Sequence, residues 1–214
     1  MIQTLKENKA FIVPYAIILL SVLCFVLVFD KADIHIYLNR FRYPAADWFF
    51  KYFTHTGDGI FAFLFTLSLL FVKFRYAVIA AISTTLTGVL VQFLKLVVFE
   101  DLCRPLMYFE TVYSGSYELR LVAGAPPGLF YTFPSGHAAT AFAIFFLLAM
   151  ISKKRYIKFL FFIVAGISAY SRVYLSWHFL NDIAMGSLIG VLITFSAYWI
   201  IHRSKRRWLD KSFI

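Results

Sequence analysis

The segment Thr132–Asp182 reads TFPSGHAATAFAIFFLLAMISKKRYIKFLFFIVAGISAYSRVYLSWHFLND. It contains two apolar runs, at about 134–151 and 159–177, each close to the roughly 20 residues that a helix needs to cross the hydrocarbon core of a bilayer. The short stretch between them is strongly basic and carries Lys153, Lys154, Arg155 and Lys158. We therefore predict two transmembrane helices joined by a tight turn on one side of a membrane.

The same segment carries two polar signatures. The first is Phe133–His137, with the letters FPSGH, and the second is Ser171-Arg172, then five residues, His178, three residues and Asp182. Ionisable side chains at membrane depth are expensive to desolvate and tend to persist only with a partner or a function. These residues therefore need an explanation.

The pair His178 and Asp182 has a helical spacing of four positions. On a helix, that spacing puts both side chains on one face, where the carboxylate can hold one imidazole nitrogen. The other nitrogen would then be an unprotonated nucleophile or base. The alternative is a structural His–Asp pair, in which the two side chains serve only as hydrogen-bond partners of each other in a polar patch.

The run Pro134-Ser135-Gly136 has the form of a helix start, because proline is tolerated at the first helical position. Free N–H groups of a first turn bind anions, and Gly136 would let a phosphate approach the backbone. His137 would lie at the mouth of that site. The alternative is a simple turn, which Pro-Ser-Gly often marks.

A third polar element lies upstream, where Lys95 is followed by Arg104-Pro105. Together the three elements resemble the signature of the type-2 phosphatidic acid phosphatase superfamily, which is Lys-x6-Arg-Pro, Pro-Ser-Gly-His and Ser-Arg-x5-His-x3-Asp. The second and third elements match residue for residue. The first departs, because eight residues instead of six separate Lys95 from Arg104.

The resemblance implies a six-helix membrane fold and a set of roles. His178 would be the nucleophile that forms a phosphohistidine, Asp182 would orient it, and His137 would be the general acid that protonates the leaving oxygen. The phosphate-binding groups would be Lys95, Arg104, Ser135, Gly136 and Arg172. The sequence has no closely spaced cluster of carboxylates or histidines, so we expect no metal and no cofactor.

The longer first element has a geometric consequence. Seven helical positions rotate about 700° and return to nearly the same face, whereas the nine positions from Lys95 to Arg104 rotate about 900° to the opposite face. One continuous helix could not aim both side chains at one phosphate. We therefore predict that the helix breaks near Phe99–Asp101 and that Arg104 approaches from a loop held by Pro105.

The rest of the chain favours an all-α membrane protein with one domain, 1–214. Further apolar runs at about 11–29, 53–72, 76–98 and 179–201 bring the predicted spans to six. The interfacial segment 30–51 and the long connection 99–133 separate some of them. At the start of the second span, we interpret His55 and Asp58 as an interfacial helix cap; the alternative is that they line the site.

The net charge of +10 has an asymmetric distribution. With the N-terminus inside, the inner segments contain only two acids, Glu7 and Asp210, against a large basic set: Lys6, Lys9, Lys73, Arg75, Lys153, Lys154, Arg155, Lys158, Arg203, Lys205, Arg206, Arg207 and Lys211. This positive-inside pattern predicts cytoplasmic termini and places the three polar elements on the outer side. The charge is thus explained by topology and anionic lipid, and a nucleic-acid partner is not expected.

An outer-facing phosphate site in a membrane predicts a lipid phosphate as the substrate. The candidates are phosphatidate, phosphatidylglycerol phosphate, undecaprenyl diphosphate and a lipid A phosphate, and the sequence does not rank them. We expect a bacterial inner membrane with the site facing the periplasm or outside, and the oligomeric state stays open.

Three other functions remain as alternatives. A lipid phosphotransferase could use the same intermediate, and a non-catalytic lipid-binding member could keep the fold, although both histidines are present. Vanadium haloperoxidases share the motifs but are soluble, so the six apolar runs argue against that class.

Overall fold

The computed structural model describes residues 2–214, and within that range every regular element is helical. The elements are α1 (Ile2–Glu7), α2 (Lys9–Val28), α3 (Lys31–Asn39), α4 (Pro44–Phe53), η1 (Thr54–Gly57), α5 (Gly59–Ser68), η2 (Leu69–Phe71), α6 (Phe74–Phe93), η3 (Leu94–Val98), α7 (Pro105–Thr111), α8 (Gly136–Ile151), α9 (Arg155–Tyr174), α10 (Leu180–His202) and η4 (Arg207–Asp210). Element η3 is a π-helical turn that continues α6. The predicted all-α class is confirmed.

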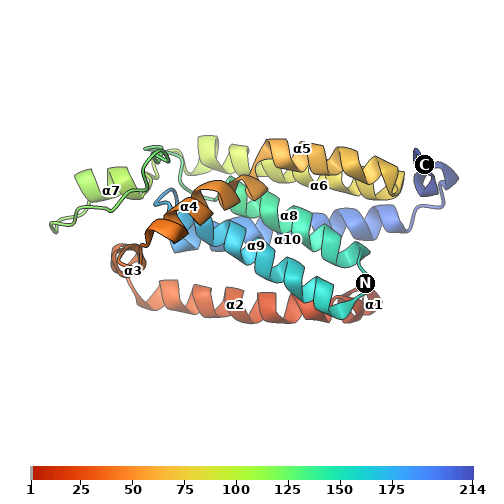
Figure 1. Ribbon diagram of the computed structural model, residues 1–214, viewed down its shortest axis with the longest axis horizontal. Helices are drawn as coiled ribbons and strands as arrows, with labels where there is room; N and C mark the ends of the chain where they lie inside the picture. Colours follow the sequence, from red (N-terminus) through yellow and green to blue (C-terminus); the bar gives the residue numbers. More distant parts are fainter. Residues whose placement is uncertain (1) are drawn as a thin grey trace.

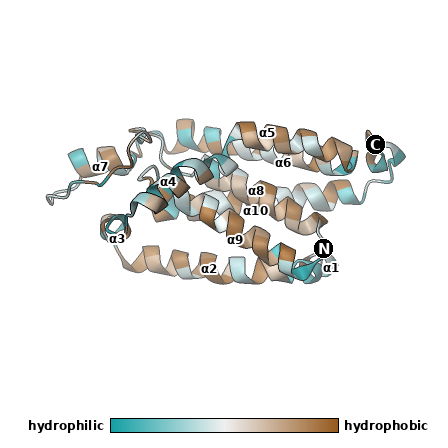
Figure 2. Cartoon of the chain, viewed as in Figure 1, coloured by the Kyte–Doolittle hydropathy of each residue, from teal (hydrophilic) through white to brown (hydrophobic). Residues whose placement is uncertain are grey.

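Four helices are long and apolar enough to cross a membrane: α2, α6 with η3, α9 and α10. A fifth crossing is possible if α4–η1 and α5–η2 form one span, but these two parts meet at an angle of 58°. Helix α8 is apolar but has only 16 residues. Figure 2 shows hydrophobic residues along much of these helices and hydrophilic ones near α1 and the C-terminus. The chain is an integral membrane protein.

Helix α8 is the centre of the bundle and packs against α6, α9 and α10. Most of its side chains are buried, which its alanine-rich sequence permits because small side chains let neighbouring helices approach closely. Gly186 and Gly190 of α10 face it, and a Cβ atom at either position would overlap the carbonyl oxygen of Ser135 or Ala139, respectively. Helices α8 and α10 therefore meet backbone to backbone.

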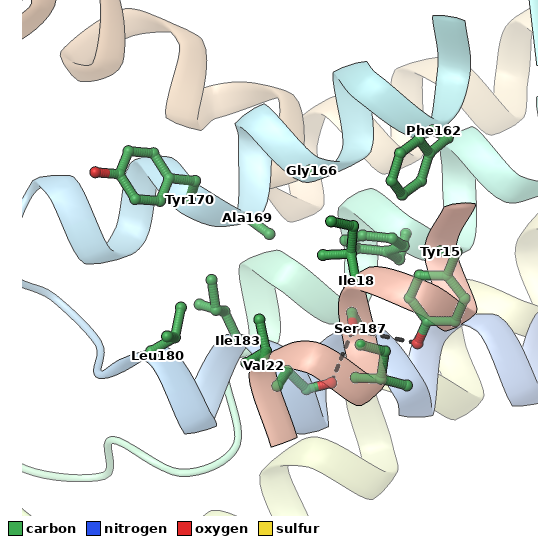
Figure 3. Close-up of a pocket in the computed structure, with 13 residues that line it drawn as sticks. Tyr15, Ile18, Val22, Phe162, Gly166, Ala169, Tyr170, Leu180, Ile183 and Ser187 are labelled. Carbon is green, nitrogen blue, oxygen red and sulfur yellow. Dashed lines mark hydrogen bonds between the residues drawn. The ribbon is translucent and has the colours of Figure 1, made fainter. Parts of the chain in front are cut away.

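Helix α2 packs more loosely, against α9 and α10. An apolar cavity of about 220 Å³ lies between these three helices and α8. In Figure 3 the hydroxyl groups of Tyr15 and Ser187 meet at its inner wall, 3.3 Å apart, and Gly166 faces it from α9. Ser187 also donates to the Ala184 carbonyl, as a polar side chain inside a membrane helix is expected to do.

Both termini lie at the same end of the bundle, on the right in Figure 1. Arg75, at the start of α6, is buried there and holds the C-terminal tail. Its guanidinium donates to the Ile201 carbonyl at 2.6 Å and to both carboxylate oxygens of Asp210 at 3.0 and 2.9 Å. The opposite end, which we call the distal end, is formed by α3, α4, α7 and the segment 112–133.

Three predicted boundaries are wrong for local reasons. Helix α8 begins at Gly136, because Ser135 is its N-cap and Pro134 lies outside the helix. The predicted span 159–177 ends at Tyr174, where Ser176 has a left-handed backbone with φ 56°. The predicted span 53–72 is interrupted at Asp58, between η1 and α5.

Candidate active site

The three polar elements of the sequence meet at the distal ends of four helices. Lys95 lies in η3 at the end of α6, Ser135–His137 begin α8, and Arg172 lies in the last turn of α9. His178 lies in the loop between α9 and α10, and Asp182 is in the first turn of α10. Residues separated by almost ninety positions are thus brought to one place.

The predicted contact between His178 and Asp182 is confirmed. Asp182 Oδ2 lies 3.3 Å from His178 Nδ1, although only Asp182 is on a helix. The same oxygen accepts from Thr132 Oγ1 at 2.5 Å and from the Phe179 N–H at 2.9 Å. Asp182 therefore both caps α10 and fixes the tautomer of His178, with Nε2 free of a proton.

Thr132 belongs to this group, and no pattern in the sequence assigns it a role. Its hydroxyl lies 3.3 Å from His178 Nδ1 and donates to Asp182. Its backbone N–H donates to the Leu102 carbonyl at 3.1 Å. The hydroxyl adds a second fixed contact that restrains the imidazole ring.

Lys95, Arg104 and Arg172 form no salt bridge with any carboxylate in residues 2–214. Arg172 is 2% exposed and Lys95 is 8% exposed. Unpaired cations at such burial are costly, so they favour a negatively charged ligand. We therefore expect these cations to bind an anion.

The Arg172 guanidinium is held from two sides. Its Nη1 donates to Thr54 Oγ1 at 2.8 Å, and its central carbon lies 3.9 Å from the centroid of the Trp177 ring. Its Nε is buried with no hydrogen-bond partner among the described residues. One donor of a rigid fork is therefore left for another acceptor.

The predicted break between Lys95 and Arg104 is confirmed. The helix ends with the π turn Leu94–Val98, and Arg104 occupies the N-cap position of α7 with Pro105 at its start. The Arg104 backbone N–H donates to the Leu129 carbonyl at 2.7 Å, and its Nε donates to the Phe130 carbonyl at 2.9 Å. The long connection thus fixes Arg104 from behind.

These cations act on His178. Burial holds the pKa of His178 well below its usual range, and the positive charges of Lys95, Arg172 and Arg104 lower it further. Burial likewise lowers the pKa of Arg104. A neutral imidazole with a free Nε2 is the form required of a nucleophile.

The segment Ser135–His137 forms the start of α8. Ser135 is fully buried; its Oγ accepts from the Ala138 N–H at 3.4 Å, and its own N–H donates to the Asp182 carbonyl at 3.0 Å. This bond ties the first turn of α8 to the first turn of α10. Gly136 and His137 are half-buried, so the first-turn backbone is partly accessible. Direct phosphate contacts of Ser135 and Gly136 stay predictions.

His137 has a partner that we did not favour from the sequence. Its Nε2 contacts Asp58 Oδ1, and the other carboxylate oxygen of Asp58 lies 2.6 Å from His55 Nδ1. Asp58 occupies the N-cap position of α5 but makes no capping hydrogen bond with its side chain. The alternative interpretation, that these residues line the site, therefore fits Asp58, whereas His55 is exposed and contacts the carboxylate of Asp58 from the other side.

Gly57 explains how η1 reaches His137. A Cβ atom at Gly57 would lie only 2.7 Å from the His137 carbonyl oxygen, so only glycine permits this approach. Among residues 2–214, no group of three or more His, Cys, Asp or Glu side chains is arranged to hold a metal ion.

The PAP2 superfamily pattern matches residues 76–206, which is more than half of the chain. This chain belongs to the PAP2 superfamily. The predicted membership in the type-2 phosphatidic acid phosphatase superfamily is thus confirmed.

Two curated relatives carry the name lipid A 4'-phosphatase. The one from Bacteroides thetaiotaomicron is 31% identical over 77 residues, which are 36% of this chain and 34% of the relative. The one from Porphyromonas gingivalis is 27% identical over 82 residues, which are 38% of this chain and 35% of the relative. The chain therefore matches only about a third of the length of each.

Two solved structures share the fold. The crystal structure of Aquifex aeolicus LpxE is 27% identical, with a TM-score of 0.68, and the match covers 78% of this chain and 93% of that one. The first transmembrane PAP2 type phosphatidylglycerolphosphate phosphatase from Bacillus subtilis is 20% identical, with a TM-score of 0.59, covering 94% and 98%. The second likeness concerns the fold alone.

Proposed function

We propose that this protein is a membrane lipid phosphatase that hydrolyses a phosphate ester through a phosphohistidine at His178. The observation that carries the proposal is the buried, neutral His178 surrounded by Lys95, Arg104 and Arg172, none of which has a carboxylate partner in residues 2–214. Membership in the PAP2 superfamily supports the same chemistry.

In the first step, His178 Nε2 attacks the phosphorus atom and a nitrogen–phosphorus bond forms. The phosphorus–oxygen bond to the lipid breaks, and His137 gives a proton to the departing oxygen. The three cations stabilise the charge on the phosphoryl oxygens. Asp182 stabilises the imidazole as it becomes positive.

In the second step, the neutral His137 takes a proton from a water molecule that attacks the phosphohistidine. The nitrogen–phosphorus bond breaks, inorganic phosphate leaves, and both histidines regain their starting states. We propose that no metal is required, because three fixed cations supply the positive charge that this displacement needs.

The membrane arrangement follows from the same hypothesis. We propose that 1–214 is one phosphatase domain with six crossings, formed by α2, the bent α4–α5 unit, α6, α8, α9 and α10. The location of both termini at one end of the bundle supports an even number of crossings. The basic inner segments support cytoplasmic termini, and we place the protein in a bacterial inner membrane with the site outside.

Among the substrate candidates, the relatives favour a lipid A phosphate. Both curated relatives are named lipid A 4'-phosphatase. Phosphatidate, phosphatidylglycerol phosphate and undecaprenyl diphosphate belong in the same assay, because the cation cluster recognises the phosphate and not the lipid.

The test is phosphate release by detergent-purified protein from these four lipid classes, with and without EDTA, beside His178→Ala. We expect release from at least one lipid, unchanged by EDTA and abolished in the variant. Release that needs a divalent metal, or that persists without His178, contradicts the mechanism. No release from any lipid favours a phosphotransferase or a lipid-binding protein.

A further inference from the structure

The loop that carries His178 begins with a specific helix ending. The Trp177 N–H donates to the Arg172 carbonyl at 2.9 Å, and the Ser176 N–H donates to the Val173 carbonyl at 3.0 Å. These two bonds define a Schellman motif, whose turn residue takes a left-handed backbone and is usually glycine. Here that residue is Ser176, with φ 56°.

A serine at this position is strained, because its Cβ atom crowds the following carbonyl group. Ser176 is also completely buried. Glycine would relieve the strain without loss of the motif. The side chain of Ser176 therefore needs a reason of its own.

The Ser176 hydroxyl is the meeting point of three polar side chains from the distal end. Its Oγ lies 2.9 Å from Arg42 Nη2, 3.2 Å from Asn39 Nδ2 and 3.2 Å from His35 Nε2. The first two are donors and occupy both lone pairs of the oxygen, so the hydroxyl proton points to His35. His35 and Asn39 are on α3, and Arg42 lies three residues after its end.

The network is anchored on both sides of the loop. Arg42 Nη2 also contacts the Tyr174 carbonyl, which is one of the free carbonyls at the end of α9. Asn39 pairs with the Arg120 backbone, donating to its carbonyl at 3.1 Å and accepting from its N–H at 3.0 Å. Helix α3 and the long connection 99–133 thus both help to hold Ser176 in place.

The turn at Ser176 sets the direction of the two residues that follow. The His178 N–H donates to the Arg172 carbonyl at 3.2 Å, and Trp177 stacks on the Arg172 guanidinium. Trp177 Nε1 is fixed by the Ala125 carbonyl at 3.0 Å. A shift at Ser176 would therefore move both the nucleophile and a phosphate-binding arginine.

We propose that His35, Asn39 and Arg42 are positioning residues that act through the Ser176 hydroxyl to aim His178 at the phosphate. This inference rests on the proposed phosphatase function and attributes part of the positioning of His178 to α3. None of the three residues touches the substrate in this proposal. They preorganise the loop, so that the imidazole needs little further ordering in the transition state.

His35 suits this task because it stays neutral. Burial and the neighbouring Arg42 lower the pKa of His35 to about 3. The hydrogen bond from Ser176 to His35 is therefore independent of pH over the working range.

The decisive variant is Ser176→Gly, which removes the hydroxyl and also removes the backbone strain. If the network positions His178, we expect the variant to remain folded, because relief of the backbone strain offsets part of the cost of leaving the Arg42 and Asn39 donors without their acceptor. We expect kcat lowered about tenfold and KM changed less than twofold. Asn39→Ala should lower kcat in the same way. The double variant should have the same kcat as Ser176→Gly, because both changes remove parts of the same hydrogen-bond network.

The matched control is Ser187→Ala. Ser187 is also a buried serine with two hydrogen-bond contacts, to Tyr15 and Ala184, but it lies in the wall of the apolar cavity away from the loop (Figure 3). We expect wild-type kcat. A similar fall in kcat in this control would assign the effect to general packing and overturn the inference.

A second readout separates this inference from the proposed function. Orthovanadate mimics a phosphoryl group in attack by histidine, and its dissociation constant can be measured without turnover. We expect Ser176→Gly to weaken vanadate binding at least fivefold relative to wild type and Ser187→Ala. This result upholds the inference even if no lipid is hydrolysed, whereas unchanged kcat and unchanged vanadate affinity in an active enzyme would sink it.

Discussion

The carboxylate of Asp58 joins two histidines, with one oxygen on His137 Nε2 and the other on His55 Nδ1. Because Nε2 of His137 is held, Nδ1 is the nitrogen that the proposed proton transfer would use. His178 has the reverse arrangement, with Nδ1 held by Asp182 and Nε2 free. The two histidines of the site are thus fixed by acids on opposite ring nitrogens.

The first prediction concerns Asp58. Asp58→Asn should lower kcat by about 10- to 100-fold, because an unoriented general acid loses part of the 10²- to 10⁴-fold that such groups contribute. The measurement is steady-state lipid phosphate release. His55→Gln, which changes the exposed partner of the same carboxylate, should stay within about twofold of wild type. Equal losses in both variants would contradict a specific role for the His137 contact.

The second prediction concerns the fork geometry of Arg172. Arg172→Lys keeps the charge but loses the hydrogen bond to Thr54 and the stacking on Trp177. We expect kcat/KM to fall about 100-fold, which corresponds to roughly 2.7 kcal/mol of transition-state stabilisation. Arg155→Lys, at the start of α9 and far from Arg172, is the control and should leave kcat/KM unchanged.

The third prediction is a pH profile. The positive charge of Arg104 lowers the pKa of His178, so removing that charge should raise it. The acidic limb of kcat/KM, where His178 becomes protonated and inactive, should therefore move to higher pH in Arg104→Gln. The substrate's own ionisation is common to both enzymes and cancels in the comparison. An unmoved limb would show that Arg104 does not act on His178.

The fourth prediction tests the contact between α8 and α10. Gly186→Ala should destabilise the protein and reduce activity strongly, because the added methyl group overlaps the Ser135 carbonyl and pushes the first turn of α8 away from α10. Gly166→Ala adds the same methyl group where no atom lies within 4 Å and should have little effect. Thermal unfolding in detergent and the lipid assay together check both variants.

The fifth prediction concerns the C-terminal tail. Arg75 lowers the pKa of Asp210 below its ordinary value. A carboxylate with a lowered folded-state pKa adds stability that is present above the unfolded-state pKa, about 3.9, and is lost as pH falls through the folded-state value. Arg75→Ala should thus lower the melting temperature at pH 7, and the gap from wild type should narrow below about pH 4. A gap that is constant with pH would exclude the ion pair as its source.

The sequence predicted the parts of the site that follow from spacing. The break before Arg104 follows from nine positions that a helix cannot aim at one phosphate, so it depends only on helix geometry. The spacing of four positions also indicated the contact of His178 with Asp182, but the helical argument does not account for it, because His178 lies in the loop before α10. The pattern of apolar runs likewise predicted the helical membrane class.

The missed features depend on tertiary contacts that spacing does not encode. Asp58 lies where a helix cap is expected, and only the approach of η1 to α8 reveals that its side chain reaches His137. Thr132 and Ser176 fall between motif positions, and a hydroxyl side chain in such a place gives no periodic signal. The hydropathy pattern also did not indicate the 58° bend between η1 and α5, because the segments on both sides of it are apolar.

The unpaired charges of Lys95, Arg104 and Arg172 have a consequence for product release. In the proposed mechanism, inorganic phosphate keeps the oxygens that these cations would bind, so we expect it to leave the site less readily than the dephosphorylated lipid. We expect free phosphate in the compartment that the site faces to compete with the lipid substrate. The rate of lipid dephosphorylation would then be coupled to the local phosphate supply, and phosphate starvation would speed the enzyme without any change in its amount.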